Sequence, residues 1–428
     1  MCYPKKKTGV NFHKKILFVF IVSCFASAGF SQPAEIKKTP MVETFYTINN
    51  EPLYWFSSRK DMKRATEWLT EIEKARQFVS VADKQLTVQL LNVLHNRKST
   101  GNALKEKTDQ QITGLILNFI KDMQEGVVHF DYDEVSAPRD SVYIYQLRNS
   151  RYKGPVSKII SRLGCKDPDY LVLKKYLKDS IRATDTLNYK KVVLAMKYLN
   201  YIAVNHQPEY IVVNIPETEA RYHRNDQLVL KMKIVVGKKR NPTPAIASYI
   251  TSIVTFPYWN VPFSIASKEL LPKIQKDESY LERNNFEVVD AKGNVVDDLE
   301  LNWADYNEKN FPYFFRESTG PNNSLGVLKF NLQNPFSIYL HDTNSKGAFT
   351  KELRFLSHGC IRLEKPVELA ELLTEGKVDA NELKSGKQNT ESKIIKLTKK
   401  IPVFIVYMPV IVDGQKVTLL KDVYGLIQ

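Results

Sequence analysis

The spacing of apolar residues changes about halfway along the chain, and this change constrains the fold more than any other feature. The first part has apolar residues at helical spacing, and the clearest example is 108–126, which opens on a capping box. The second part is β-rich, and within 228–237 apolar residues alternate with lysines. The sequence therefore predicts an α+β protein, with a mostly helical scaffold domain over 32–208 and a mainly β domain over 209–428.

The β-rich part is interrupted between residues 264 and 320 by a polar stretch with some helical character. Loops of that length without structure of their own are uncommon in compact domains. We therefore expect a lid or an inserted subdomain at 264–320 rather than a bare connection.

The first 31 residues have the composition of a secretory signal peptide. Five lysines precede a short apolar run that begins at Ile16, and small residues follow this run as far as Ser31. Cleavage is expected after Ser31 or after Ala28, which would release the protein into the periplasm or cell envelope. Two alternatives would keep the chain on a membrane through its N-terminus, namely an uncleaved anchor and lipidation at Cys24.

The chain carries 62 lysines and arginines against 47 acidic residues, a formal net charge of +15. Loss of the five leader lysines would leave a charge of about +10, which favours contact with polyanions such as cell-wall carboxylates and lipid phosphates. The basic residues are scattered, so a role in solubility alone is the alternative. No nucleic-acid-binding signature is present, and nucleic acid is not expected as a partner.

Four cysteines are too few for a scaffold built from disulfides, and removal of the leader would leave only Cys165 and Cys360. Cys360 closes the stretch Ser357-His358-Gly359-Cys360, in which a glycine lets the backbone approach a substrate closely. A cysteine thiol with a pKa near ~8.5 needs a neighbouring base to attack carbonyl carbon at neutral pH.

Two histidines compete for the role of that base. His358 lies two residues before Cys360, and His341 ends an apolar segment 19 residues before it, so that two strands and a loop could bring them together. The residues alone leave other readings of Cys360 open: a metal ligand, one half of a disulfide, or a small core residue.

The stretch from His341 to Leu363 closely resembles the active-site signature of the L,D-transpeptidases, or YkuD family. That signature is a histidine, a loop, then Ser or Thr followed by His-Gly-Cys, a hydrophobic residue and Asn or Arg; here it ends in Ile361-Arg362. Further segments, among them FPYWNVPFSI and GPNNSLGVLKF, resemble the YcbB-like multidomain branch. The resemblance implies a YkuD-like catalytic domain over 209–428, with 264–320 as its capping subdomain.

The resemblance also implies a reaction. Cys360 would attack a peptidoglycan stem-peptide carbonyl at the L-centre of a diamino acid and expel the terminal D-alanine. His341 would be the general base, His358 and Ser357 would shape the site, and the N–H groups of Gly359 and Cys360 would hold the oxyanion. The amine of a second stem peptide would then resolve the thioester and cross-link the wall.

Other residues are implied to bind substrate. Arg362 could hold a carboxylate by its planar fork. Trp259, Tyr339 and Arg316 would line the cleft, although core packing is the alternative for the two aromatic residues and a surface ion pair for Arg316. Carbapenem-type β-lactams are implied as covalent inhibitors, and no metal or organic cofactor is implied. The small peptidoglycan-binding domain common in that branch is not recognisable in 140–208.

Several functions share these residues. The same fold and nucleophile would serve an L,D-carboxypeptidase, an enzyme that hydrolyses cross-links, or one that links proteins to the wall. A catalytically silent wall-binding protein would have no need of His341, His358 and Cys360 together. A zinc site made from the same three residues is disfavoured, since CxxC and HxxxH spacings are absent from the sequence.

Overall fold

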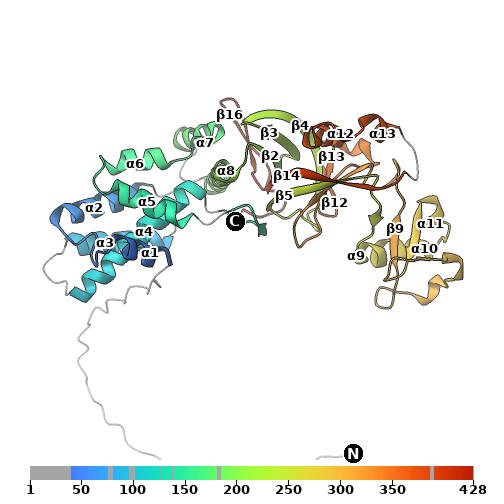
Figure 1. Ribbon diagram of the computed structural model, residues 1–428, viewed down its shortest axis with the longest axis horizontal. Coiled ribbons are helices and arrows are strands. Elements are labelled where there is room, and N and C mark those ends of the chain that lie inside the picture. The colour runs from blue at the N-terminus through green and yellow to red at the C-terminus, as the bar shows by residue number, and fades with distance from the viewer. Residues whose placement is uncertain are drawn as a thin grey trace, which may run out of the picture. The chain divides into compact units, whose positions relative to one another are not determined.

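The computed structural model describes residues 40–75, 81–95, 102–126, 128–136, 139–180, 185–385 and 390–427. Figure 1 shows the helices and strands of these segments. The predicted signal peptide, with Cys24 and Ser31, lies outside the described residues. Within the described segments, every helix is too short or too polar to span a membrane.

Helices dominate the described residues before 206, as the helical spacing predicted. They are α1 (Pro40–Asn49), α2 (Arg59–Lys74), α3 (Val81–His95), α4 (Asn102–Glu125), α5 (Asp140–Ser150), α6 (Val156–Leu163), α7 (Pro168–Asp179) and α8 (Thr186–Asn205), with the short strand β1 (Tyr132–Asp133) before α5. Local capping supports the helix starts: the Asp61 N–H donates to the Ser58 hydroxyl ahead of α2, and the Tyr170 N–H donates to Asp167 ahead of α7.

Helices α1 to α6 enclose a core of their own, which includes the buried side chains of Trp55, Trp68 and Ile116. The buried Asp109 carboxylate of α4 ties the loop between α1 and α2 to this core. It accepts hydrogen bonds from the backbone N–H groups of Tyr54, Trp55 and Phe56. This satisfies a buried charge that would otherwise be costly to keep in the interior.

The sheet that follows is closed on itself. Its strands run in the order β1-β5-β10-β11-β13-β4-β3-β2-β14, and β14 also pairs with β5. The strands are β2 (Glu209–Asn214), β3 (Glu219–Arg224), β4 (Gln227–Gly237), β5 (Ile246–Thr255), β10 (Leu328–Leu332), β11 (Leu340–His341), β12 (Phe355–Ser357), β13 (Ile361–Leu363) and β14 (Lys393–Val406). Because the edges pair, the sheet forms a barrel without exposed edge strands along that ring.

Helices α7 and α8 pack on this barrel rather than on the first core. Leu173 of α7 and Val192 and Met196 of α8 share one hydrophobic cluster with Val213 of β2 and Phe404 of β14. Helices α12 (Pro366–Thr374) and α13 (Ala380–Lys384) contribute to the same cluster. A hairpin of β15 (Val410–Asp413) and β16 (Lys416–Leu419) follows β14. The helical region is therefore divided between two cores.

The polar stretch between β5 and β10 forms a subdomain with a third core. A small sheet has the order β6-β9-β7-β8, and Trp303, Phe311 and Phe315 are buried beside it. Its elements are β6 (Trp259–Asn260), α9 (Phe263–Ile265), η3 (Ala266–Leu270), α10 (Leu271–Ile274), α11 (Tyr280–Arg283), β7 (Phe286–Val289), β8 (Val295–Val296), η4 (Asp298–Glu300), η5 (Trp303–Asp305) and β9 (Phe314–Glu317). The predicted α+β class, a helical region followed by a mainly β domain with an insertion, is confirmed.

Candidate active site

Strand pairing brings His341, the last residue of β11, close to Cys360, the residue directly before β13. His341 ends β11, which runs parallel to β13 with His341 opposite Arg362. Just before that pair, the Ile361 N–H donates to the carbonyl of Tyr339 at 3.1 Å, so that Cys360 lies beside Tyr339. Two short strands and the connection between them thus bring the histidine close to the cysteine, as the spacing in the sequence allowed.

The connection between β11 and β13 is held by buried polar contacts. It contains the 3-10 helix η6 (Lys346–Thr350), and the buried guanidinium of Arg354 donates to the carbonyls of Ile234 and Thr218. The Asp342 carboxylate accepts from the Val327 N–H at 3.0 Å and pairs with Lys346. The Asp342 side chain therefore organises the loop.

The turn around Gly359 sets the direction of the Cys360 backbone. The Ser357 hydroxyl donates to the Cys360 carbonyl at 2.6 Å and accepts from the Gly359 N–H at 3.1 Å. Gly359 has a φ of +123°, and an added Cβ would lie 3.1 Å from the Cδ1 atom of Ile338. The Gly359 N–H is thus already used, whereas within the described residues no hydrogen bond uses the Cys360 N–H.

The thiol of Cys360 lies in a partly enclosed position, with its Sγ atom 3.7 Å from the Ser337 carbonyl oxygen. Burial raises the pKa of the Cys360 thiol, while contacts to Tyr339 and the charges of Lys329 and Arg362 act in the opposite direction. Within the described residues, neither Cys360 nor Cys165 forms a disulfide. A protonated thiol at neutral pH needs a proton acceptor before it can attack.

His341 can supply that acceptor. Its side chain is buried, and burial together with the charge of Arg362 lowers the pKa of His341 to about 3. The imidazole is therefore neutral at physiological pH, although a hydrogen bond with the backbone of Asp342 acts in the opposite direction on its pKa. One ring nitrogen of a neutral imidazole carries no hydrogen and can accept a proton.

His358 has different surroundings. Its Nε2 atom lies 2.8 Å from the Oε1 atom of Glu269, in the π-helical turn η3 of the inserted subdomain. The two histidines thus differ: His341 is buried in the barrel strands, and His358 is a partly exposed contact to the insertion. Glu269 was not predicted from the sequence, because only tertiary packing places it beside the motif.

A cleft of about 900 Å³ opens over the thiol, and its walls come from the barrel and the insertion. The residues predicted for the site that line it are Trp259, Tyr339, His341, Ser357, His358, Cys360 and Arg362, and Lys329 of β10 joins them. Arg316 does not line the cleft itself. It donates to the Glu287 carboxylate on the adjacent strand, and its guanidinium lies 5.2 Å from the centre of the ring of Tyr258, which does line the cleft.

Across the described segments, no group of three or more His, Cys, Asp or Glu side chains has an arrangement suited to a metal ion. His341 and Cys360 line the same cleft, and a thiol and a neutral imidazole are the groups that nucleophilic acyl transfer uses.

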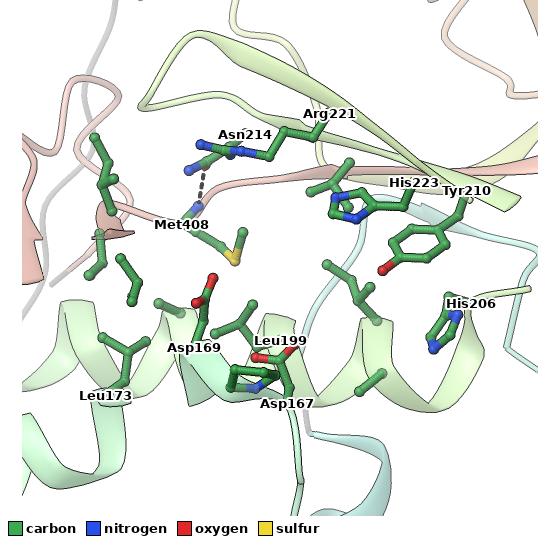
Figure 2. Close-up of a pocket in the computed structure, with 18 of the residues that line it drawn as sticks. Asp167, Asp169, Leu173, Leu199, His206, Tyr210, Asn214, Arg221, His223 and Met408 are labelled. Carbon is green, nitrogen blue, oxygen red and sulfur yellow. Dashed lines mark hydrogen bonds between the residues drawn. The ribbon is translucent and has the colours of Figure 1, made fainter. Parts of the chain in front are cut away.

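A second cavity, of about 600 Å³, lies between α7 and α8 on one side and β2 and β3 on the other. Figure 2 shows Arg221, His223 and Tyr210 of the strands facing Asp167 and Asp169 near the start of α7. Burial, with the Asp167 charge, raises the pKa of Asp169 to about 6. None of the described side chains lining this cavity is a cysteine, serine or threonine. The described lining of this cavity therefore offers no thiol or aliphatic hydroxyl, unlike the cleft at Cys360.

Comparisons with known proteins identify a family that the chain resembles. Residues 208–394 match the family model described as the L,D-transpeptidase catalytic domain, YkuD. A Haemophilus influenzae protein named "Putative L,D-transpeptidase" is 34% identical over 219 residues, which cover 50% of this chain and 44% of that protein. The chain thus matches less than half the length of this relative.

Solved structures give weaker similarities. The NMR structure of the catalytic domain of an Enterococcus faecium L,D-transpeptidase, acylated by ertapenem, is 15% identical; 47% of this chain and 98% of that one are covered, with a TM-score of 0.24. An L,D-transpeptidase from Mycobacterium smegmatis is 12% identical, with coverage of 46% and 58% and a TM-score of 0.21.

Proposed function

We propose that the protein is a peptidoglycan L,D-transpeptidase, since residues 208–394 match the catalytic-domain family YkuD. One observation carries the proposal: the thiol of Cys360, which directly precedes β13, and the buried neutral imidazole of His341, at the end of the neighbouring parallel strand β11, line the same cleft. The activity of the whole protein is part of the proposal, because the curated relative is matched over less than half its length.

The first half of the reaction forms a thioester. His341 takes the thiol proton as the Sγ atom of Cys360 attacks the carbonyl carbon at the L-centre of the stem's diamino acid. The C–N bond to the terminal D-alanine then breaks, and His341 returns the proton to the leaving amine. The N–H of Cys360 is the backbone donor left for the negative oxygen, since the Gly359 N–H is bonded to Ser357.

The second half of the reaction releases the acyl group from Cys360. The amine of a second stem peptide attacks the thioester carbon, and His341 accepts the amine's proton. The C–S bond breaks and the proton goes to sulfur, which restores the thiol and leaves an amide between two diamino acids. Water in place of the amine would give the carboxypeptidase reaction, and attack on an existing cross-link would give hydrolysis by the same residues.

The remaining predicted residues position these groups. Ser357 holds the turn through its two hydrogen bonds, and His358 connects the turn to the insertion. Trp259 and Tyr339 form walls of the cleft, and Arg362 is a cation beside the thiol. Arg316 pairs with Glu287 and lies over the ring of Tyr258 at the cleft, so its contact with substrate stays a prediction.

The test is incubation with purified tetrapeptide-stem muropeptides, followed by mass spectrometry of the products. Cross-linked dimers with loss of D-alanine are expected. Tripeptide stems alone would identify a carboxypeptidase, whereas unchanged stems with retained binding to peptidoglycan sacculi would identify a wall-binding protein without catalysis.

Export to the periplasm or cell envelope is the second part of the proposal, and the lysine-rich and apolar pattern of residues 1–31 supports it. Cell fractionation with N-terminal sequencing of the mature chain tests it. A mature start at residue 32 or 29 is expected. A chain still holding residues 1–31, or one that starts at a lipid-modified Cys24, would make it a membrane-anchored enzyme.

A further inference from the structure

The second cavity, between helices α7 and α8 and strands β2 and β3, is separate from the cleft at Cys360 (Figure 2). It has a volume of about 600 Å³, and none of its described lining residues belongs to that cleft. Cavities of this size hold small organic ligands when apolar walls surround a few polar groups that point inwards. The lining of the second cavity has both features.

One part of this lining is apolar and buried. Its side chains come from α7, α8, β2 and the segment around β15, and they include Leu173, Ala195, Ile202, Val212, Met408 and Val410. The exposed part of the lining is mostly charged, and it includes Lys166, Asp169 and Asp226. A ligand in this cavity would therefore place a hydrocarbon part against the buried wall and a polar group at the exposed side.

Tyr210 of β2 gives the cavity a buried hydroxyl group. The residue is only 9% exposed, and its ring stacks on that of His223 with 4.7 Å between the ring centres. Figure 2 shows the hydroxyl pointing into the cavity. Among the described residues, none forms a hydrogen bond with this hydroxyl. The large majority of buried hydroxyl groups are paired, so this one is available to a molecule that enters the cavity.

The cavity is acidic, although the whole chain has a formal net charge of +15. Apart from its histidines, the charged residues that line it are four acids and two bases, namely Asp167, Asp169, Glu217, Asp226, Lys166 and Arg221. Arg221 is already balanced, because it donates to the carboxylates of Glu217 and Glu219 at 2.8 and 3.1 Å. Lys166 is exposed to water. The cavity should therefore repel an anionic ligand and attract a cationic one.

Asp169 is the lining acid without a partner. Asp167 accepts a hydrogen bond from the Tyr170 N–H, and Asp226 lies 3.7 Å from the Nε2 atom of His206. Among the described residues, the Asp169 carboxylate has neither a hydrogen bond nor an ion pair. Burial and then the charge of Asp167 raise the pKa of Asp169. A cation beside Asp169 would offset that repulsion between the two carboxylates.

We propose that the second cavity binds a small primary amine as its ammonium ion, with the nitrogen at Asp169 and the hydrocarbon part against the buried apolar wall. An ammonium group has three hydrogen-bond donors and no acceptor. The Asp169 carboxylate and the Tyr210 hydroxyl offer acceptors on opposite walls of the cavity (Figure 2). A metal ion fits less well, because across the described segments no three His, Cys, Asp or Glu side chains are grouped to hold one.

The experiment titrates the full-length protein with n-hexylamine and measures the affinity by ligand-observed NMR. At pH 8 the Asp169 carboxylate is ionised, since its pKa is about 6, and an alkylamine carries a positive charge. The comparison probes are 1-hexanol, which has the same chain without a charge, and hexanoate, which has the opposite charge. n-Hexylamine should bind about tenfold to hundredfold more tightly than either, the range expected for a hydrogen bond between charged groups.

Variants then locate the bound amine. Asp169→Asn should weaken n-hexylamine binding by about tenfold to hundredfold and leave 1-hexanol unaffected. Asp179→Asn is the matched control, because it removes an acid of the same helix that does not line the cavity. Ala203→Leu adds bulk to the α8 wall and should weaken binding by about tenfold, without any change of charge. Thermal melting shows that each variant is folded, and Asp169→Asn should melt as the wild type does.

Three results would overturn the inference. The first is no binding of n-hexylamine to the wild type, and the second is equal binding of n-hexylamine and 1-hexanol. The third is unchanged n-hexylamine affinity in Asp169→Asn or Ala203→Leu, since the amine would then bind elsewhere, for example beside the acids of the cleft at Cys360. None of these results involves Cys360 or His341, so the proposed function stands or falls separately.

Discussion

The Nε2 atom of His358 and the Oε1 atom of Glu269 are 2.8 Å apart, although 89 residues separate them in the sequence. This contact joins the catalytic turn of the barrel to the inserted subdomain. It is partly exposed on both sides, and exposed pairs of this kind stabilise proteins by about 0–1 kcal/mol. We therefore expect the contact to align the two sides of the cleft rather than to add to the stability of the fold.

Replacement of Glu269 tests whether this contact aligns the cleft. Glu269→Ala should change the melting temperature by no more than a few degrees, since an exposed pair contributes little. It should lower kcat/KM several-fold, about twofold to fivefold, because the insertion no longer holds the turn. The control is Glu278→Ala, an exposed acid of the same subdomain. Equal effects of the two variants on kcat/KM would show that the His358–Glu269 contact has no specific role in the reaction.

Removal of the thiol should abolish the reaction. Cys360→Ala should leave no measurable turnover and a nearly unchanged melting curve, because a partly buried thiol is replaced by a slightly smaller group. Cys165→Ala is the matched control and should keep full activity. Product analysis by mass spectrometry and thermal melting check both variants. Substantial turnover by Cys360→Ala would exclude it as the nucleophile.

Carbapenems should acylate the same atom. A thiol that forms a thioester with a stem peptide also presents a nucleophile to the strained amide of a β-lactam ring. Intact-mass measurement should show one adduct on the wild type and none on Cys360→Ala. An adduct of the same size on both proteins would place the modification on another residue.

The base can be assigned from the response to alkaline pH. His341→Ala should slow acylation by ~10²–10⁴-fold, the usual effect of losing a general base. Raising the pH from about 6 to 9.5 should partly rescue this variant, because the thiol then ionises without help. His358→Ala should respond less, since it disturbs the position of Cys360. Stopped-flow acylation rates measure both, and rescue confined to His358→Ala would make that residue the base.

The acid side of the pH profile gives a separate check. His341 acts as a base in its neutral form, and its pKa of about 3 keeps that form dominant at any pH well above 3. The wild-type kcat/KM, which reports the free enzyme, should therefore stay level as the pH falls from 8 to 5. An ordinary histidine pKa of 6.5 would instead cause a loss of roughly thirtyfold at pH 5. A loss of that size in a folded protein would contradict the buried neutral state.

Local sequence patterns predicted the class of the fold, and the resemblance to a family signature pointed to His341 and Cys360. His341 ends β11 and Cys360 directly precedes β13, so one connection separates them and their spacing in the sequence allowed them to lie close together. Helix α4 begins at Asn102 rather than Thr108, because its first turns are mostly exposed and polar and lack the apolar spacing that marked the rest. A helix end whose residues are exposed shows no apolar spacing, so its position is hard to predict from the sequence.

Residues brought in by long-range pairing could not be predicted in this way. Lys329 occupies a polar position in the alternation of β10, but only the register with β11 places it beside His341. Arg316 was expected in the cleft, and the pairing of β7 with β9 places it opposite Glu287. Register depends on neighbouring strands, and a single strand's sequence does not contain it.

The division of the helical region between two cores has a practical meaning for dissection of the protein. The family match begins at residue 208, yet β1 pairs with β5 through Tyr132 and Ile246, and Phe130 and Met196 lie in the barrel's core. A fragment that begins at residue 208 would lack β1 and α8. It would therefore expose to water the hydrophobic surface of the barrel that they cover. The smallest portable catalytic unit therefore begins near residue 128, some 80 residues before the boundary that sequence similarity marks.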